Sequence, residues 1–351
     1  MKNIHCKNYN IHINDWVSFE KYYKQKNPSL IFILVDENTE KYCLLHLLEH
    51  IERPVQIIKI QSGEQHKNLN TCEIVWAELL QKRADRHSLL INLGGGVIGD
   101  LGGFCAATYM RGIRFIQLPT TLLSQVDASV GGKLGVDMSG FKNMLGLIKD
   151  PDGVFIFTDF LHSLPSRQIK SGFAELFKHG LISDKSVWDQ LSKLIIPDVR
   201  DFEELVYKSV VIKKNITEKD PYEKGLRKIL NFGHTIGHAV ESHWMGSRTP
   251  LLHGEAIAIG IVCEAFLSYR IGNISEDELF NIRNTILGTY GHHPKLVKQP
   301  DDLIQIMRRD KKNHSGKILF ALLTSIGEAC FDVQVEKEAI SESFLFYREK
   351  I

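Results

Sequence analysis

The chain has 351 residues, of which 43% are hydrophobic and 24% charged, and its formal net charge is +1. This length fits two domains, and the near-neutral charge gives no reason to expect nucleic acid or an acidic membrane surface as a partner. The N-terminal residues lack the apolar core of a signal peptide, and no run approaches a membrane span. Six scattered cysteines without a C-x-x-C pair indicate reduced, mostly buried thiols, so we expect a cytoplasmic protein.

The first half of the chain alternates short β-rich runs with helical stretches. Segments 66–86 and 97–110 are predicted helices. Several of the runs are almost continuously apolar, as in a parallel sheet that is covered on both faces. The pattern predicts an α/β domain with a doubly wound parallel sheet over residues 1–165. The predicted strands are 29–35, 55–60, 88–93, 115–118 and 154–157.

The second half, residues 166–351, is predicted to be a mainly α-helical domain. Strand signals nearly vanish there, and long helical patterns follow one another. Only 317–323 and 329–333 look extended, and we expect them to form a late hairpin.

A glycine cluster, Gly94–Asp100, follows the predicted strand 88–93. It is neither a G-x-G-x-x-G fingerprint nor a P-loop, so the cluster alone fits a tight turn as well as a pyrophosphate site at a helix N-terminus. Two neighbouring segments favour the second interpretation. Ser62–Lys67 offers a carboxylate and an ammonium group in one turn, and Pro119–Thr121 places two hydroxyls after the next strand.

Cations and glycines follow in segments 125–135 and 141–144, which are predicted loops. Paired glycines precede Lys133, and Lys142 is followed by an asparagine. Loop lysines are ordinarily solvated, so these residues alone do not define a site. Further on, Glu175 and Lys178 share one helical face among apolar residues, which fits either a buried salt bridge or a metal-binding carboxylate beside a cation.

The most informative segment is 231–255, which overlaps a polar stripe over 227–241. The polar residues of the stripe recur at spacings of 4, 3, 4 and 3, which predicts one face of a single helix. Because most of the intervening residues are apolar, this stripe is suited to line a cavity that holds a cation and an anionic ligand. Spacing alone makes both histidines of the stripe candidate zinc ligands. The stripe consists of Arg227, Asn231, His234, His238 and Glu241.

Taken in order, these segments resemble the 3-dehydroquinate synthase family of sugar-phosphate cyclases over essentially the whole chain. The resemblance implies a Rossmann-like N-terminal domain, a helical metal-binding C-terminal domain and a homodimer. It also implies NAD and either Zn²⁺ or Co²⁺ as cofactors. The matching segments are Ser62–Lys67, Gly94–Asp100, 106–115, 119–135, 142–143, 164–165, Glu175–Lys178, Gly225–Glu241, Leu252–Glu255 and 310–312.

The family reaction converts 3-deoxy-D-arabino-heptulosonate 7-phosphate, a sugar-acid phosphate, into 3-dehydroquinate and phosphate in the shikimate pathway. It proceeds by transient NAD-dependent oxidation, phosphate elimination, re-reduction and intramolecular aldol closure. The resemblance therefore implies a phosphorus–oxygen lyase.

The resemblance assigns roles by matched position. The implied metal ligands are Glu175, His234 and His253. The implied NAD-binding residues are Asp36, Asn38, Glu64, Lys67, Gly95, Gly96, Val97, Asp100, Thr120, Thr121, Asp127, Lys133, Lys142, Phe160 and Ser163. The implied substrate-binding and catalytic residues are Lys133, Asn143, Lys178, Lys213, Arg227, Asn231, His238 and Lys311, with Arg111 reaching the phosphate site of a partner subunit.

Three residues depart from the usual family pattern, namely Leu134, Phe141 and Gln168. They affect the expected detail of the nicotinamide pocket rather than the class of reaction. Three alternatives stay open. An inosose or valiolone synthase would need no carboxylate clamp, a metal-dependent polyol dehydrogenase would form NADH, and a binding protein would release no phosphate.

Overall fold

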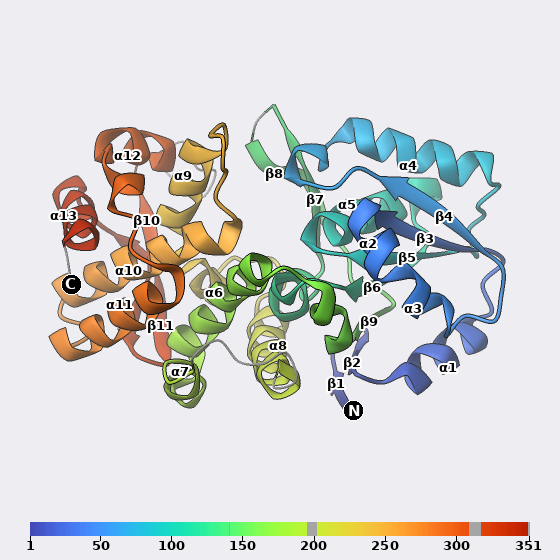
Figure 1. Cartoon of the computed structure of the whole chain (residues 1–351), viewed down its shortest axis with the longest axis horizontal. Coiled ribbons are helices and arrows are strands. Elements are labelled where there is room, and N and C mark those ends of the chain that lie inside the picture. The colour runs from blue at the N-terminus through green and yellow to red at the C-terminus, as the bar shows by residue number, and fades with distance from the viewer. Residues whose placement is uncertain (140, 195–201, 309–316, 350–351) are drawn as a thin grey trace. The chain divides into compact units, whose positions relative to one another are not determined.

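The computed structural model describes residues 1–139, 141–194, 202–308 and 317–349. The chain forms two compact units (Figure 1). Unit 1 comprises Met1–Pro165 and Asp198–Lys214, and unit 2 comprises Ser166–Pro197 and Asn215–Ile351. The segment 198–214 thus belongs with unit 1, although the sequence analysis places it in the second domain.

Unit 1 is built on a seven-stranded sheet with the order β1-β2-β9-β6-β5-β3-β4, in which only β1 runs antiparallel to its neighbour. The strands are β1 (Lys2–His5), β2 (Asn10–Ile13), β3 (Ile31–Asp36), β4 (Val55–Ile60), β5 (Leu89–Gly94), β6 (Arg114–Pro119) and β9 (Gly153–Ile156). The connecting helices are α1 (Trp16–Lys26), α2 (Glu37–Tyr42), α3 (Leu44–Leu48), α4 (Leu69–Gln81) and α5 (Gly96–Thr108). Short helical turns are η1 (Glu64–His66), η2 (Tyr109–Arg111), η3 (Ser124–Ala128) and η4 (Thr158–Ser163).

Both faces of this sheet are buried, which explains the continuous apolar runs. Along β3, Ile31, Ile33 and Val35 belong to a core cluster with residues of α1 and α3. Phe32 and Leu34 point to the other face and join residues of α4 and α5. Because successive strand residues face opposite sides, each face needs its own apolar set. The predicted doubly wound α/β domain is confirmed.

The sheet order also defines the ligand-binding edge of unit 1. The chain goes from β3 outward to β4, then returns to β5 on the other side of β3. The carboxyl ends of β3 and β5 therefore flank a topological switch point, where parallel sheets of this type bind ligands. Asp36 ends β3, and Gly95 directly follows β5.

A separate two-stranded ribbon, β7 (Lys133–Met138) and β8 (Phe141–Ile148), corrects one prediction. The residues Lys133, Lys142 and Asn143, which we expected in loops, lie on these antiparallel strands. Leu134 and Val136 are buried in the core cluster that includes α5, so the ribbon is held by packing on one face. The alternating strand pattern of β7 and β8 was hard to recognise in the sequence, because the strands are short and contain or adjoin glycines and lysines.

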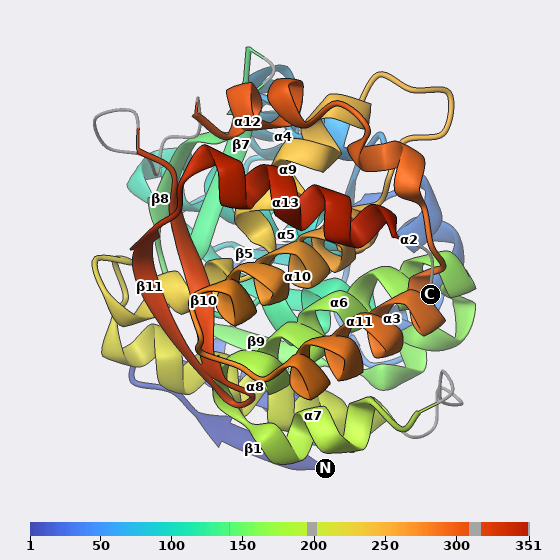
Figure 2. The same cartoon turned by 90° about the vertical axis from the view of Figure 1, so that its left-hand side faces the viewer.

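Unit 2 is mainly helical, as predicted, and α10 forms its centre. Almost all of α10 is buried, because α6, α9, α11, α13 and β10 contact it (Figure 2). Its helices are α6 (Ser166–Ser183), α7 (Lys185–Leu191), α9 (His234–Trp244), α10 (His253–Arg270), α11 (Glu276–Tyr290), α12 (Pro300–Arg308) and α13 (Lys337–Arg348), with short turns η6 (Leu226–Asn231) and η7 (Pro294–Val297). Helix α8 (Phe202–Lys219) is shared between the units, because its residues up to Lys214 belong to unit 1. The predicted late hairpin is confirmed as β10 (Leu319–Ser325) and β11 (Glu328–Gln334).

The predicted single helix over 227–241 is wrong. Turn η6 ends at Asn231, Gly233 adopts a left-handed conformation with φ 79°, and α9 begins at His234. The polar residues keep their helical spacing across Gly233, so the spacing alone could not show that the helix is interrupted there.

All six cysteines are free thiols and four of them are buried, as expected. None of the helices in the described part of the chain has the length and apolar character that crossing a membrane requires.

Candidate active site

Three side chains of unit 2 converge at the centre of the candidate metal site. Oε1 of Glu175 lies 3.3 Å from Nε2 of His234 and 3.5 Å from Nε2 of His253. The other oxygen of Glu175, Oε2, forms an ion pair with Nζ of Lys178, one turn along α6. Glu175 and Lys178 are both buried, so their side chains are fixed by their surroundings.

These separations suit a single bound ion. Ligand atoms that lie about 2.1 Å from a tetrahedral zinc ion are about 3.4 Å apart from one another. The two distances to Glu175 bracket that value. His238 is also close, because ligand nitrogens of His234, His238 and His253 all lie within 4.8 Å of one another. The residues fit a metal ion, either with Glu175 or with His238 as the third ligand.

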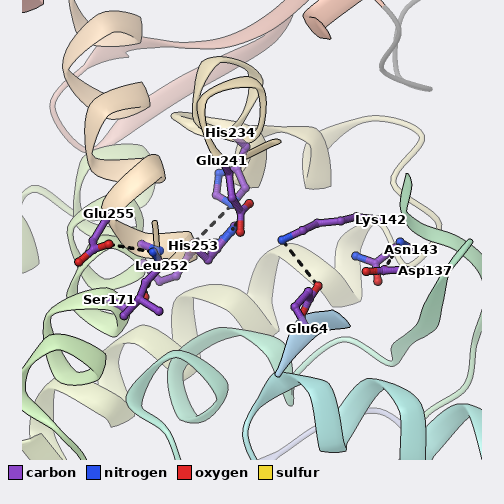
Figure 3. Close-up of polar contacts among 12 residues, drawn as sticks. Glu64, Asp137, Lys142, Asn143, Ser171, His234, Glu241, Leu252, His253 and Glu255 are labelled. Carbon is purple, nitrogen blue, oxygen red and sulfur yellow. Dashed lines mark hydrogen bonds and ion pairs between the residues drawn. The ribbon is translucent and has the colours of Figure 1, made fainter. Parts of the chain in front are cut away.

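The second nitrogen of each central imidazole is also engaged. Nδ1 of His234 lies 3.0 Å from the carbonyl oxygen of Phe232, and Nδ1 of His253 lies 3.3 Å from Oε2 of Glu241. Figure 3 shows Glu241 and His253 directed toward each other, with His234 beside them. A carbonyl can only accept, so it holds the proton on Nδ1 and leaves the lone pair of Nε2 facing Glu175. Metal-binding histidines usually have such partners.

The charges of this cluster are strongly coupled. Burial alone would raise the pKa of Glu175, but Lys178 and His234 hold it well below its usual value. Burial likewise opposes protonation of His253, yet Glu175 and Glu241 raise its pKa to about 9. The pKa of His234 is lowered by burial and by Lys178. The site therefore keeps an ionised carboxylate in a buried, polar environment.

The N-terminus of α10 fixes His253, its first residue. The carboxylate of Glu255 receives two hydrogen bonds from Arg167, at 2.7 and 2.8 Å, and one from the backbone N–H of Leu252 at 2.8 Å. The N–H of Gly254 donates to Oγ of Ser171 at 3.0 Å. These contacts attach the start of α10 to α6, the helix that carries Glu175.

The loop before α9 positions two predicted substrate residues. The carboxylate of Asp220 accepts the backbone N–H groups of Gly225 at 2.7 Å and of Arg227 at 3.1 Å. Arg227 is buried and donates from Nη1 to the carbonyl of Pro221, while Asn231 donates to Glu223 at 2.8 Å.

In unit 1, a buried ammonium group lies beside the glycine turn. Nζ of Lys67 lies 3.0 Å from Oε1 of Glu64 and 3.4 Å from Oδ2 of Asp100, and it donates to Oδ1 of Asn143 at 2.9 Å. Burial would lower the pKa of Lys67, but Asp100, Glu64 and Asp137 raise it above its usual value. Burial raises the pKa of Asp100 to about 6, although Lys67 opposes that shift.

Asn143 and Lys142 reach the same group from β8. The backbone N–H of Asn143, whose φ is 51°, donates to Oδ1 of Asp137 at 2.8 Å, and Nζ of Lys142 lies 3.6 Å from Oε1 of Glu64 (Figure 3). The structure thus brings together cofactor residues and one substrate residue that the sequence places far apart.

Other predicted cofactor residues surround the glycine turn of unit 1. A Cβ atom at Gly95 would lie 3.1 Å from Cγ2 of Thr121, so the two segments are adjacent. The backbone N–H of Thr120 donates to the carbonyl of Gly94 at 3.0 Å. Lys213 contacts Asp127 through the carboxylate at 2.8 Å and through the backbone carbonyl.

Next to the switch point lies an open pocket of about 650 Å³. Its walls come from the end of β4, from residues 66–74 and from Glu37. The neighbouring Asp36 caps α2, because its Oδ1 accepts the backbone N–H groups of Asn38 and Thr39.

A few predicted residues lie elsewhere. The ring of Phe160 is buried in the core, and Oγ of Ser163 donates to the Phe160 carbonyl. Lys133 is exposed at the start of β7. Arg111 is exposed and has φ 65°. Lys311 is outside the residues that the structure describes.

Sequence reasoning did not assign three residues that shape this site. Glu241 is part of the polar stripe, but its contact with His253 depends on how α9 and α10 pack. Asp220 organises the loop around Arg227, and Glu264 reaches α9 from α10. A carboxylate inside a long apolar helical segment was the available signal for Glu264.

Two family models match successive parts of the chain. The model described as 3-dehydroquinate synthase N-terminal matches residues 57–171, and the one described as 3-dehydroquinate synthase C-terminal matches residues 172–313. A 3-dehydroquinate synthase from Parabacteroides distasonis is 42% identical over 98% of this chain and 97% of its own length. One from Sulfurovum sp. is 37% identical over 92% of this chain and 94% of its own length.

Solved structures agree with the fold. A 2-deoxy-scyllo-inosose synthase complexed with carbaglucose-6-phosphate, NAD⁺ and Co²⁺ has a TM-score of 0.86 and 25% identity, covering 98% of this chain and 99% of that one. A 2-epi-5-epi-valiolone synthase from Streptomyces hygroscopicus with NAD⁺ and Zn²⁺ has a TM-score of 0.85 and 24% identity, covering 99% of this chain and 98% of that one, which supports the fold alone. The fold is that of a sugar-phosphate cyclase. Within that class, the chain belongs to the 3-dehydroquinate synthase family.

Proposed function

We propose that the protein is a 3-dehydroquinate synthase, which converts 3-deoxy-D-arabino-heptulosonate 7-phosphate into 3-dehydroquinate and phosphate. The observation that carries the proposal is the convergence of two imidazole nitrogens on Oε1 of Glu175. This cluster occurs in a chain that is 42% identical, almost end to end, to a protein of that name.

We further propose that Glu175, His234 and His253 hold a Zn²⁺ or Co²⁺ ion, with His238 left to contact substrate. When bound, the ion would act as a Lewis acid toward hydroxyl and carbonyl oxygens of the substrate. The chain prepares the ligands for this role. Lys178 pairs with Oε2 of Glu175, and Phe232 and Glu241 engage Nδ1 of the two histidines, so both Nε2 atoms face Oε1. The related cyclase complexed with Co²⁺ supports this choice of ion.

For NAD we propose the switch point of unit 1. When bound, NAD would accept a hydride from the substrate and later return it, so that no net oxidation occurs. The glycine turn after β5 and the start of α5 offer backbone N–H groups to a pyrophosphate. The residues proposed to surround NAD are Asp36, Asn38, Glu64, Lys67, Gly95, Gly96, Val97, Asp100, Thr120, Thr121, Asp127, Lys133, Lys142, Phe160 and Ser163.

The substrate carries a carboxylate and a phosphate, and we propose that cations of the chain bind and orient them. Buried Arg227 is the best-supported clamp, because Asp220 and Pro221 fix its backbone and side chain. Charge-assisted bonds from such a group are short and strong. The other proposed residues are Lys133, Asn143, Lys178, Lys213, Asn231, His238, Lys311 and Arg111. We propose that the protein acts as a phosphorus–oxygen lyase, as a homodimer in the cytoplasm.

The decisive experiment measures phosphate release from the sugar-acid phosphate by protein supplied with NAD and either Zn²⁺ or Co²⁺. We expect release that a chelator abolishes and added metal restores, without accumulation of NADH. Accumulating NADH would indicate a polyol dehydrogenase instead.

The likeness to a solved 2-deoxy-scyllo-inosose synthase makes that activity the second candidate. A sugar phosphate that lacks the carboxylate serves as the matched substrate. Faster phosphate release from this substrate than from the sugar-acid phosphate would overturn the proposal.

A further inference from the structure

Glu264 is a fully buried carboxylate in the middle of α10 that belongs to none of the residue sets proposed above. Its two oxygens accept backbone N–H groups of a different helix. Oε2 accepts the N–H of Gly233 at 2.6 Å, and Oε1 accepts the N–H of Ile236 at 3.0 Å. These two donors flank His234, the first residue of α9.

The start of α9 needs such a partner. The N–H groups in the first turn of a helix have no acceptor within the helix, and a buried helix end must obtain one elsewhere. The residue at the N-cap position is Gly233, which has no side chain to supply it. In a capping box, one side chain accepts the N–H at N3 and another accepts the N–H at the N-cap. Here a single carboxylate from α10 does both, and its negative charge also suits the helix dipole.

Close packing of the two helices lets this carboxylate reach its donors. A Cβ atom at Gly260 would collide with the carbonyl oxygen of Gly233. A Cβ atom at Gly237 would lie 3.0 Å from Cα of Ile257 and 3.1 Å from the carbonyl oxygen of Ala256. The backbones of α9 and α10 therefore touch along glycines, and Glu264 lies one turn beyond Gly260, beneath the start of α9.

The same turn sets the direction of the His234 ring. Gly233 is held with φ 79°, and the preceding carbonyl, that of Phe232, lies 3.0 Å from Nδ1 of His234. Nε2 of that ring faces Oε1 of Glu175, and Figure 3 shows the ring beside His253. If the N–H of Gly233 lost its acceptor, the Phe232 carbonyl and the His234 backbone would both be less restrained.

We propose that Glu264 is a positioning residue for the metal centre, which it serves by holding the turn at Gly233 so that Nε2 of His234 points toward Glu175 and His253. This inference rests on the proposed function, since it assumes that these residues bind an ion.

The test compares Glu264→Gln and Glu264→Leu with the unchanged protein in titrations with Co²⁺. A glutamine oxygen can accept only one of the two N–H groups, and leucine can accept neither. Loss of an outer partner of a metal ligand typically lowers affinity roughly 10–100-fold. We expect a loss in that range, larger for leucine than for glutamine, with a changed visible absorption spectrum of bound Co²⁺.

Ser268→Ala is the matched control. Ser268 is equally buried on α10. Its hydroxyl accepts the N–H of Leu323 in β10 and donates to the backbone carbonyl of Glu264, and neither of these hydrogen bonds involves α9. We expect this variant to keep the Co²⁺ affinity and spectrum, even if its midpoint of thermal unfolding falls.

Three outcomes separate the possibilities. If both Glu264 variants unfold more easily but bind Co²⁺ with unchanged affinity and spectrum, Glu264 is merely structural and the inference is wrong. If the unchanged protein binds no Co²⁺, or if His253→Ala binds it equally well, the proposed metal site itself fails. If Co²⁺ binding weakens in the Glu264 variants while Ser268→Ala is normal, the positioning role stands.

Discussion

Oε2 of Glu241 lies 3.3 Å from Nδ1 of His253, on the side of the ring opposite to Glu175. A carboxylate in this place orients the imidazole and increases its basicity toward a metal ion. We therefore expect Glu241→Gln to lower the affinity for Zn²⁺ by roughly 10–100-fold, with little change in folding. Competition with a chelating dye measures this affinity. The control is His243→Asn on the same helix, because His243 contacts Gln299 rather than the cluster. Equal affinities in the two variants would contradict the role of Glu241.

The choice between the two possible ligand sets is testable with alanine variants of the three histidines. We expect His234→Ala and His253→Ala to lose more affinity than the roughly 10–100-fold that an outer partner contributes. His238→Ala should retain one ion per chain, because Glu175 supplies the third ligand. Metal content after dialysis checks both statements. Loss of the ion from His238→Ala, with Glu175→Gln unaffected, would instead favour the three-histidine set.

Removal of the Lys67 charge should destabilise unit 1. Its Nζ lies among Glu64, Asp100 and Asp137, so Lys67→Met leaves these partly exposed carboxylates without their shared cation. Breaking a fully buried ion pair in this way costs about 3–5 kcal/mol, and we expect a smaller loss here because solvent reaches the carboxylates. Urea unfolding measures the loss. Lys142→Met is the control, because its ammonium group is more exposed and lies 3.6 Å from Glu64. A similar free energy of unfolding for both variants would contradict the prediction.

The stability of the protein should depend on pH through Asp100. Its pKa in the folded state is about 6, above that of an aspartate in an unfolded chain, which is about 3.9. The folded state therefore binds more protons between these values, and the contribution of Asp100 to the free energy of unfolding falls as the pH rises from about 4 to 6. Compared with Asp100→Asn, the unchanged protein should lose on the order of 2 kcal/mol over this range. Parallel stability curves for the two proteins would show that Asp100 titrates normally.

Gly260→Ala should damage both the fold and the metal site. The added methyl group would meet the carbonyl oxygen of Gly233, and overpacking of this kind typically costs about 1–3 kcal/mol. Gly288→Ala on α11 meets open space, so better helix propensity should stabilise it by up to about 1 kcal/mol. Thermal unfolding of the two variants should shift in opposite directions. An unchanged midpoint of thermal unfolding for Gly260→Ala would mean that α9 and α10 can move apart at little cost in free energy.

The sequence predicted the sheet of unit 1 well where a strand is buried on both faces. Val55–Ile60 begins and ends where expected, and β3, β5, β6 and β9 differ by only one or two residues at their ends. Helix α4 starts later than predicted, because Asn68 accepts the N–H of Thr71 and caps it, leaving residues 64–66 as a separate turn. Strands β1 and β2 were missed, since both are short and partly exposed.

The candidate site could likewise be predicted only in part from the sequence. Local patterns identified the histidines of α9 and the glycine turn, and they left Glu175 open between a salt bridge and a metal ligand. The family resemblance assigned Glu175 and added His253. The contacts that hold them could not be predicted, because Glu241 with His253 and Glu264 with Gly233 depend on packing between α9 and α10. A carboxylate within an apolar helix suggests a partner, but the sequence does not say which backbone group it will meet.

The return of Asp198–Lys214 to unit 1 has a consequence for biosynthesis. A nascent chain that has emerged only as far as Pro165 lacks the lysine at position 213 that holds Asp127. It also lacks Glu203, which Asn14 contacts at 2.7 Å. The N-terminal sheet can form early, but the ribosome must release some fifty further residues before the first unit has all its parts. A fragment cut at the apparent boundary would therefore be an incomplete folding unit.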